Sequence, residues 1–226
     1  MIYKNIVKGE FVSRPNRFVA NVILEGEEIS CHVKTTGRCR ELLVKGAEIY
    51  LEKSDNPQRK YPYSLITVRK GDRLVNMDSQ APNKAVKEFL ESGGIFEDIK
   101  LIKPESRYGN SRFDFFVEYA DKKAFIEVKG VTLEIDGVVS FPDAPTERGS
   151  RHLKELCDCI DEGYEAYVIF VIQMKDVLYF TPAGDKDPAF AKALSFAQKK
   201  GVKILAFDCR VTENEMVITD FVEVKI

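Results

Sequence analysis

Two segments, Ser111-Arg112-Phe113-Asp114-Phe115 and Phe125-Ile126-Glu127-Val128-Lys129-Gly130, decide the fold of this chain. Each lies in a predicted strand, at residues 111–119 and 124–131, and a short charged turn separates the two strands. Strands joined by so short a turn pair as an antiparallel hairpin. The predicted hairpin brings one acidic residue of the first strand beside an acidic residue and a lysine of the second.

Alternation along the second strand places its charged residues on one face. Side chains of a strand point to opposite faces in turn, so Glu127 and Lys129 share a face, while Ile126 and Val128 point to the other face and pack inward. Asp114 stands among phenylalanines, where a carboxylate is costly unless something compensates its charge. We therefore expect Asp114 and Glu127 to come close enough to share a divalent cation.

This set of residues suits phosphodiester hydrolysis. Two carboxylates hold Mg²⁺ or Mn²⁺, which prefer oxygen ligands, and such a cation neutralises a phosphate and lowers the pKa of bound water. Lys129 would orient that water or stabilise the charge that builds up on the phosphate. The spacing D-x12-E-x-K resembles the PD-(D/E)xK nuclease pattern, with Asp114, Glu127 and Lys129 as catalytic residues. The alternative is a surface hairpin whose charges are solvated.

A predicted helix before the hairpin offers a further carboxylate. Asn83 is a suitable N-cap for a helix that ends near Ser92. Glu88 is the candidate for a third catalytic and metal-binding acid, with Glu91 second, and either also suits a solvent-exposed helix face. Glu105, which precedes the hairpin, either joins the acidic cluster or pairs with an arginine.

Strand and turn signals divide the chain near residue 80. Residues 1–80 contain short strands separated by frequent turns, which predicts a small OB-like β-barrel. Residues 81–226 alternate helices with strands, which predicts an α/β or α+β domain. We therefore expect an N-terminal OB-like β-barrel followed by a PD-(D/E)xK nuclease-like α/β domain.

Composition and charge limit the class of protein. The 226 residues are 44% hydrophobic and 31% charged, as in ordinary globular proteins, and no apolar run approaches the ~18 residues of a membrane helix. The N-terminus lacks the pattern of a signal peptide, and five scattered cysteines argue against a disulfide framework. We expect a cytoplasmic protein without a membrane partner. Its net charge of −2 combines a mildly basic first 80 residues with an acidic remainder.

Basic residues predict where nucleic acid binds. In the first 80 residues, arginines fall in or beside predicted loops and among aromatic residues, as in OB-folds that bind single strands. On a helix predicted at 146–161, a polar face lies opposite the apolar stripe. The candidates for nucleic-acid binding are Arg14, Arg17, Arg38 and Arg59 in the first part and Arg148, Arg151 and His152 on the helix. A charged face that contacts only solvent is the alternative for the helix.

Longer motifs are distinctive. They are Phe141-Pro142-Asp143-Ala144-Pro145-Thr146-Glu147-Arg148-Gly149, Glu127-Val128-Lys129-Gly130-Val131-Thr132-Leu133, Ser111-Arg112-Phe113-Asp114-Phe115, and Ser54-Asp55-Asn56 followed by Arg59-Lys60. With them, nearly the whole chain resembles the sugar fermentation stimulation protein A family of bacteria and archaea. The resemblance implies an N-terminal OB-like domain, a C-terminal PD-(D/E)xK-type domain, nucleic-acid binding and DNA/RNA nuclease activity. It implies Asp114 and Glu127 as metal-site residues, with Lys129 beside them and Glu88 as a further member.

Two functions fit these observations. The first is a metal-dependent nuclease that hydrolyses DNA, RNA or both. The second is a non-enzymatic DNA-binding regulator of sugar-utilisation genes, although there is no clear helix-turn-helix and a binder gains little from two carboxylates beside a lysine. A sugar- or nucleotide-binding module has no support, because neither familiar glycine-rich phosphate loop is present. The sequence is compatible with a homodimer but does not specify the oligomeric state.

Overall fold

The computed structural model describes residues 1–35, 37–109 and 111–226, and its first part is a closed barrel. Six strands follow one another along the chain and pair in the order β3-β2-β1-β4-β5-β6. A further parallel pairing of β3 with β5, at His32↔Ser64 and Val33↔Leu65, closes strands β1 to β5 into a ring. The strands are β1 (Ile6–Asn16), β2 (Val19–Leu24), β3 (Glu27–Val33), β4 (Glu48–Lys53), β5 (Tyr63–Lys70) and β6 (Arg73–Asn76).

The sequence pattern predicts strands at residues 18–24, 29–33, 47–52, 63–68 and 73–77, which correspond to β2 to β6, and it does not predict β1. This strand is 11 residues long, yet Phe11 is its single fully buried residue. Its pairing with β2 shifts register between Phe11 and Ser13 and again between Ser13 and Asn16. Bulges bend a strand around a barrel and interrupt the alternation of inward and outward residues. The period-two signal of a half-buried strand is therefore weak in β1.

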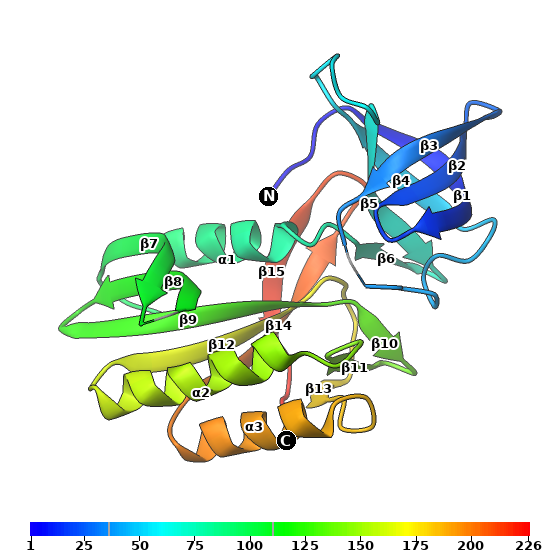
Figure 1. Cartoon of the computed structure of the whole chain (residues 1–226). Coiled ribbons are helices and arrows are strands. Elements are labelled where there is room, and N and C mark those ends of the chain that lie inside the picture. The colour runs from blue at the N-terminus through cyan, green and yellow to red at the C-terminus, as the bar shows by residue number, and fades with distance from the viewer. Residues whose placement is uncertain (36, 110) are drawn as a thin grey trace.

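The second part of the molecule is a mixed sheet covered by helices on both faces. Its strands pair in the order β15-β14-β12-β9-β8-β7, and the central strands β9, β12 and β14 are parallel. The elements are α1 (Ala81–Glu91), β7 (Ile99–Tyr108), β8 (Ser111–Tyr119), β9 (Lys122–Val131), α2 (Glu147–Asp161), β12 (Glu165–Ile172), α3 (Pro188–Lys199), β14 (Lys203–Val211) and β15 (Met216–Phe221). Helix α1 covers one face, and α2 and α3 cover the other (Figure 1).

A small sheet completes the molecule. It pairs β10 (Leu133–Ile135), β11 (Val138–Phe141) and β13 (Tyr179–Pro182), and it continues directly from the end of β9. Together the elements confirm the expected order of a barrel followed by an α/β domain. Strand β7, which the sequence pattern does not predict, lies at the sheet edge and contains Pro104, a residue that sheets tolerate mainly at edges.

A buried polar network joins the barrel to the sheet. The Gln173 side chain, at the end of β12, donates to the Asn76 carbonyl at 3.1 Å, to the Asn76 side chain at 3.0 Å and to the Asp78 carbonyl at 3.1 Å. Asp78 is fully buried, and the Lys34 ammonium lies 2.6 Å from its carboxylate. Because buried polar groups are costly when unpaired, this network holds the start of α1 in a defined place on the sheet.

Two negative features are clear within the described residues. None of their helices combines the length and the apolar character that a membrane crossing requires. The five cysteines are all free and buried.

Candidate active site

Strands β8 and β9 separate at the predicted acidic site. Their antiparallel pairing runs from Tyr119↔Lys122 to Phe115↔Ile126, while β9 continues beside β12 as far as Val131. At the point of separation, the Asp114 carboxylate accepts a hydrogen bond of 2.7 Å from the backbone N–H of Val128. The Asp114 carboxylate thus accepts from an N–H that would bond to a backbone carbonyl if the strands stayed paired. This brings Asp114 directly beside the backbone of the Glu127–Lys129 segment.

Glu127 lies at the centre of a buried cluster on the opposite strand. Its side chain is almost inaccessible, at 4% exposed. The Lys129 ammonium lies 2.5 Å from Glu127 Oε1, and His152 Nδ1 lies 2.6 Å from the same oxygen. Ile126 and Val128 point into the core under α1. The structure therefore shows the predicted alternation, with the charged residues of β9 on the α2 side.

The two carboxylates have opposite electrostatic environments. Burial and the neighbouring Glu127 charge raise the pKa of Asp114, and hydrogen bonds from Val128 and Asn83 offset this only in part. Burial also acts to raise the pKa of Glu127, but the hydrogen bond from His152 and the Lys129 charge outweigh it, so the pKa of Glu127 is lowered. Paired acids whose environments push their pKa values apart are typical of functional sites.

His152 contacts the site from within the core, contrary to the expectation that it binds nucleic acid. Its side chain is only 3% exposed, because α2 packs this residue against the sheet. Arg148 Nε donates to His152 Nε2 over 3.5 Å. A neutral ring that accepts at Nε2 carries its proton on Nδ1 and so donates to Glu127. His152 therefore orients the Glu127 carboxylate instead of meeting phosphate.

The helix before the hairpin supplies an amide to the site instead of the expected carboxylate. Asn83 Nδ2 donates to Asp114 Oδ1 over 2.6 Å, whereas the helix begins earlier, at Ala81, with Gln80 as its N-cap. Glu88 follows Asn83 by five residues, about 140° further around the helix. Its carboxylate is 56% exposed and lies 2.6 Å from the terminal ammonium of Met1. The structure therefore does not bring Glu88 to Asp114 and Glu127.

Gly130 allows three elements to meet beside Lys129. A Cβ at this position would lie 2.6 Å from Gln173 Oε1 and 2.8 Å from the Pro82 ring. Neither neighbour can give way easily, because the Gln173 amide makes three hydrogen bonds and Pro82 lies in the first turn of α1. The absence of a side chain at 130 keeps α1, and with it Asn83, in contact with the site.

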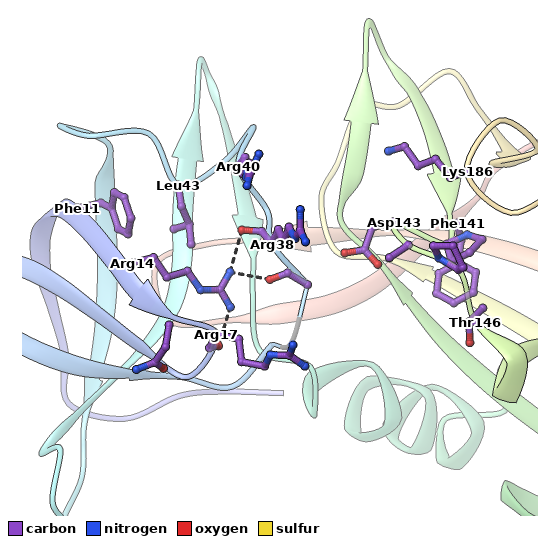
Figure 2. Close-up of a pocket in the computed structure, with 15 residues that line it drawn as sticks. Phe11, Arg14, Arg17, Arg38, Arg40, Leu43, Phe141, Asp143, Thr146 and Lys186 are labelled. Atoms are coloured by element: carbon purple, nitrogen blue, oxygen red, sulfur yellow. Dashed lines mark hydrogen bonds between the residues drawn. The ribbon is translucent and has the colours of Figure 1, made fainter.

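The arginines expected to bind nucleic acid fall into different settings. Arg14 is structural: its guanidinium donates to four backbone carbonyls of the barrel, those of Gly37, Arg38, Arg17 and Thr35, at 2.6 to 2.8 Å. Figure 2 shows this guanidinium enclosed by the loop, with Arg17 and Arg38 beside it. Arg17 and Arg38 themselves are exposed. Arg14 therefore shapes the loop that presents the two other arginines.

The remaining charged candidates lie at the surface. Arg59 is half-buried on the barrel and donates to Ser64 Oγ over 2.9 Å. Arg148 and Arg151 are exposed at the start of α2, close to the acidic site through the contact of Arg148 with His152. Glu105 forms a salt bridge of 3.1 Å with Arg112, so it takes the second of its two expected roles.

The donor set at the site fits a hard divalent cation. Among the described residues, no three His, Cys, Asp or Glu side chains form a complete ligand set. Mg²⁺, however, commonly uses one or two carboxylates and keeps several waters. Asp114 and Glu127 supply two carboxylates, and the bonds of Glu127 to described residues use Oε1. The repulsion that raises the pKa of Asp114 is one that a cation between the two acids would relieve.

Comparisons with known proteins agree across the full chain. Residues 12–77 match the family model "SfsA N-terminal OB domain", and residues 80–215 match "Sugar fermentation stimulation protein RE domain". Two proteins named sugar fermentation stimulation protein homolog are similar: that of Ruminiclostridium cellulolyticum is 58% identical over 226 residues, covering 100% of each chain, and that of Clostridium beijerinckii is 57% identical over 224 residues, covering 99% of each.

A solved structure is also similar. The Pyrococcus furiosus SfsA structure in complex with Ca²⁺ is 28% identical, has a TM-score of 0.91, and aligns with 100% of this chain and 98% of its own. The barrel and the sheet with its helices thus recur together in that structure. The chain belongs to the sugar fermentation stimulation protein family.

Proposed function

We propose that this protein is a metal-dependent nuclease that hydrolyses phosphodiester bonds of DNA, RNA or both. In this proposal residues 81–226 form the hydrolytic domain and residues 1–80 bind the nucleic acid. The observation that supports it most is the separation of β8 from β9 at Asp114, which brings this carboxylate beside the backbone of the segment that carries Glu127 and Lys129. A purely structural ion pair would not need the second, unfavourably placed acid.

Asp114 and Glu127 would hold the cation, which we propose to be Mg²⁺ or Mn²⁺. A bound divalent cation would supply Lewis acidity toward the phosphate and lower the pKa of bound water. The similar protein from Pyrococcus furiosus is described in complex with Ca²⁺, another hard cation with oxygen ligands. This supports a divalent-cation site in the family, while the choice of Mg²⁺ or Mn²⁺ follows from their use in phosphodiester chemistry.

The other residues of the site orient the two acids and meet the phosphate. His152 Nδ1 holds Glu127, and Asn83 Nδ2 holds Asp114, so both carboxylates are fixed before substrate arrives. The Lys129 ammonium lies next to Glu127 and would stabilise negative charge that grows on the phosphate. Arg148, exposed above His152, would contact a neighbouring phosphate.

The test compares Glu127→Gln with the wild-type protein on labelled DNA and RNA oligonucleotides, with Mg²⁺, with Mn²⁺ and with EDTA. We expect cleavage that EDTA abolishes and that Glu127→Gln lowers by about 100-fold or more, the scale on which a group acting in the transition state contributes. Glu118→Gln is the matched control, because Glu118 is a carboxylate of the same hairpin that pairs with Lys123 at its far end.

Equal nucleic-acid binding by wild type and Glu127→Gln, with no cleavage by either under any of these metals, would contradict the proposal. That result would favour the non-enzymatic regulator. Thermal unfolding of each variant separates loss of the site from loss of the fold.

A further inference from the structure

A large cavity opens between the barrel and the α/β domain. Its volume is about 1280 Å³, above the ~300–1,000 Å³ of common small-molecule sites, which favours an extended ligand. One wall comes from the barrel and carries Arg17, Arg38 and Arg40, and the other carries Lys186 and the segment from Phe141 to Thr146 (Figure 2). That segment is the Phe-Pro-Asp-Ala-Pro-Thr part of the motif at 141–149, and the hydrolytic site itself does not use it.

The cavity collects positive charge that the protein does not neutralise. Five basic residues and one acidic residue, Asp143, line it. Among the described residues, no salt bridge involves Arg17, Arg38, Arg40 or Lys186, although basic residues elsewhere pair repeatedly with acids, as Arg69 does with Glu48 and Lys203 with Glu165. Several unpaired cations around one hollow repel each other, and a bound polyanion relieves that repulsion.

Arg14 makes this positive wall rigid. Its four hydrogen bonds end on carbonyls, so they hold the loop of Gly37 and Arg38 without cancelling the guanidinium charge. Its Nε is buried and has no partner among the described residues. At the tip of this loop, a Cβ on Gly37 would lie 2.6 Å from Asp143 Oδ2 on the opposite wall. The two walls therefore approach each other closely at Gly37 and open on either side.

A narrower cavity adjoins this hollow and reaches the end of β9. It holds about 190 Å³ and shares Gly37, Phe141 and Asp143 with the larger one. Its lining reaches Gly130, the residue that follows Lys129 on β9. Hydroxyl and amide side chains line it, among them Ser79, Thr132 and Gln173. A volume below the ~300 Å³ of the smallest typical ligand site leaves no room for a base pair.

We propose that the larger cavity binds a single-stranded segment of nucleic acid, which continues past Gly37 toward Asp114, Glu127 and Lys129. This inference rests on the proposed nuclease function, because it assigns that site a substrate class: single strands or duplexes with unpaired ends. Backbone phosphates lie on Arg17, Arg38, Arg40 and Lys186. Phe18, next to Arg17 and 50% exposed, stacks against a base at the rim.

The test measures binding in EDTA, where hydrolysis plays no part. The probe is a fluorescent oligothymidylate of about 20 nucleotides, a length that exceeds the site size of one OB-fold, and a duplex of equal length is the comparison. We expect wild type to bind the single strand more tightly. Arg38→Ala/Arg40→Ala weakens this binding about tenfold, and lowers the slope of log affinity against log salt by about 1.4, or ~0.7 for each lost phosphate contact.

Lys100→Ala/Lys123→Ala is the matched control. It removes the same charge from the end of the sheet at the β8–β9 turn. Lys100 lies there on β7 and pairs with Asp121, Lys123 lies on β9 and pairs with Glu118, and both lysines are exposed. We expect its affinity to stay within about twofold of wild type, because neither lysine lines the cavity and salt screens exposed charges. Lys186→Glu tests the opposite wall and weakens binding as well.

Any of three results would overturn the inference. The duplex could bind as tightly as the single strand or more tightly, or Arg38→Ala/Arg40→Ala could bind with wild-type affinity. Polyglutamate could also displace the labelled strand as effectively as unlabelled strand does. The two proposals fail separately. If the protein cleaves nothing but its single-strand binding depends on the cavity arginines, the nuclease proposal fails and the cavity proposal stands. If Glu127→Gln abolishes cleavage but the arginine substitutions leave binding unchanged, the cavity proposal fails and the nuclease proposal stands.

Discussion

The acidic site and the cavity handle charge in opposite ways. At the site, Glu127 is buried and two partners compensate it within 2.6 Å. In the cavity, Arg17, Arg38 and Arg40 face the hollow and no described residue forms a salt bridge with them. Compensated buried charges fix the positions of side chains and contribute to folding. Uncompensated exposed charges leave folding nearly unchanged and act on a ligand, so the two regions should respond to different experiments.

The largest effect on folding is expected from His152→Ala. The substitution removes a buried partner of the Glu127 carboxylate and leaves a void under α2. We expect the free energy of unfolding, measured with urea, to fall by about 3 kcal/mol. His152→Gln, which keeps a donor, should recover part of the loss. His32→Ala on the half-buried barrel surface should cost under about 1 kcal/mol, and an equal loss in both variants would contradict the comparison.

Lys186→Ala should weaken binding and leave folding unchanged. Removing this half-buried charge should weaken single-strand binding about fivefold, the ~1 kcal/mol that two unit charges exchange at about 4 Å in water. The effect should fade as salt increases, and the urea unfolding midpoint should stay unchanged. Binding titrations at several salt concentrations measure this. An affinity loss that salt does not diminish would show that Lys186 acts through structure.

Asp114→Asn tests whether the two carboxylates of the acidic site affect stability in opposite directions. Because the folded pKa of Asp114 is raised, its ionised form costs stability at neutral pH, and this cost disappears as pH falls through that pKa. The variant should therefore be more stable than wild type at pH 7 in EDTA, by about 0.5–1 kcal/mol, and lose the advantage in acid. Glu127→Gln should be less stable at pH 7, since a lowered pKa means that the charged form stabilises the fold. Urea unfolding across pH tests both signs.

The smallest effect is expected from Glu88→Gln. The Glu88 carboxylate is exposed and pairs with the Met1 ammonium, and such surface pairs contribute about 0–1 kcal/mol. Unfolding should change by less than about 0.5 kcal/mol. Cleavage should stay at the wild-type rate in the same oligonucleotide assay. A 100-fold loss of cleavage would restore Glu88 as a member of the site.

Local sequence patterns predicted the residues whose positions depend on one strand. Glu127 and Lys129 share a face because the period of a strand is two, and Asp114 follows from the hairpin. The same reasoning could not place Glu88, His152 or Asn83, because a helix can dock in many rotations about its axis. Asn83 matched the pattern of a helix N-cap, yet the helix begins at Ala81, which frees the Asn83 amide for Asp114.

The barrel shows the same limit at a larger scale. Turn residues predicted its later strands, but β1 gave little signal because bulges interrupt its alternation. The cavity was also beyond local patterns. Arg17 and Arg38 were identifiable as basic loop residues, and Arg40 follows Arg38 by two positions. Lys186 joins them only through the packing of two distant parts of the chain. Arg14 shows that an arginine pattern alone does not separate a ligand contact from a hydrogen-bonded scaffold.

Gly130 has a consequence for how mutational data on this protein are interpreted. Its backbone lies within the range open to any residue, so the constraint comes entirely from Gln173 and Pro82 closing on the Cα. In saturation mutagenesis scored by cleavage, even alanine at 130 should be depleted as strongly as substitutions of Lys129. A screen of that kind would rank Gly130, which takes no part in the proposed chemistry, beside Lys129, which we propose does. Only a parallel abundance measurement would tell the two apart.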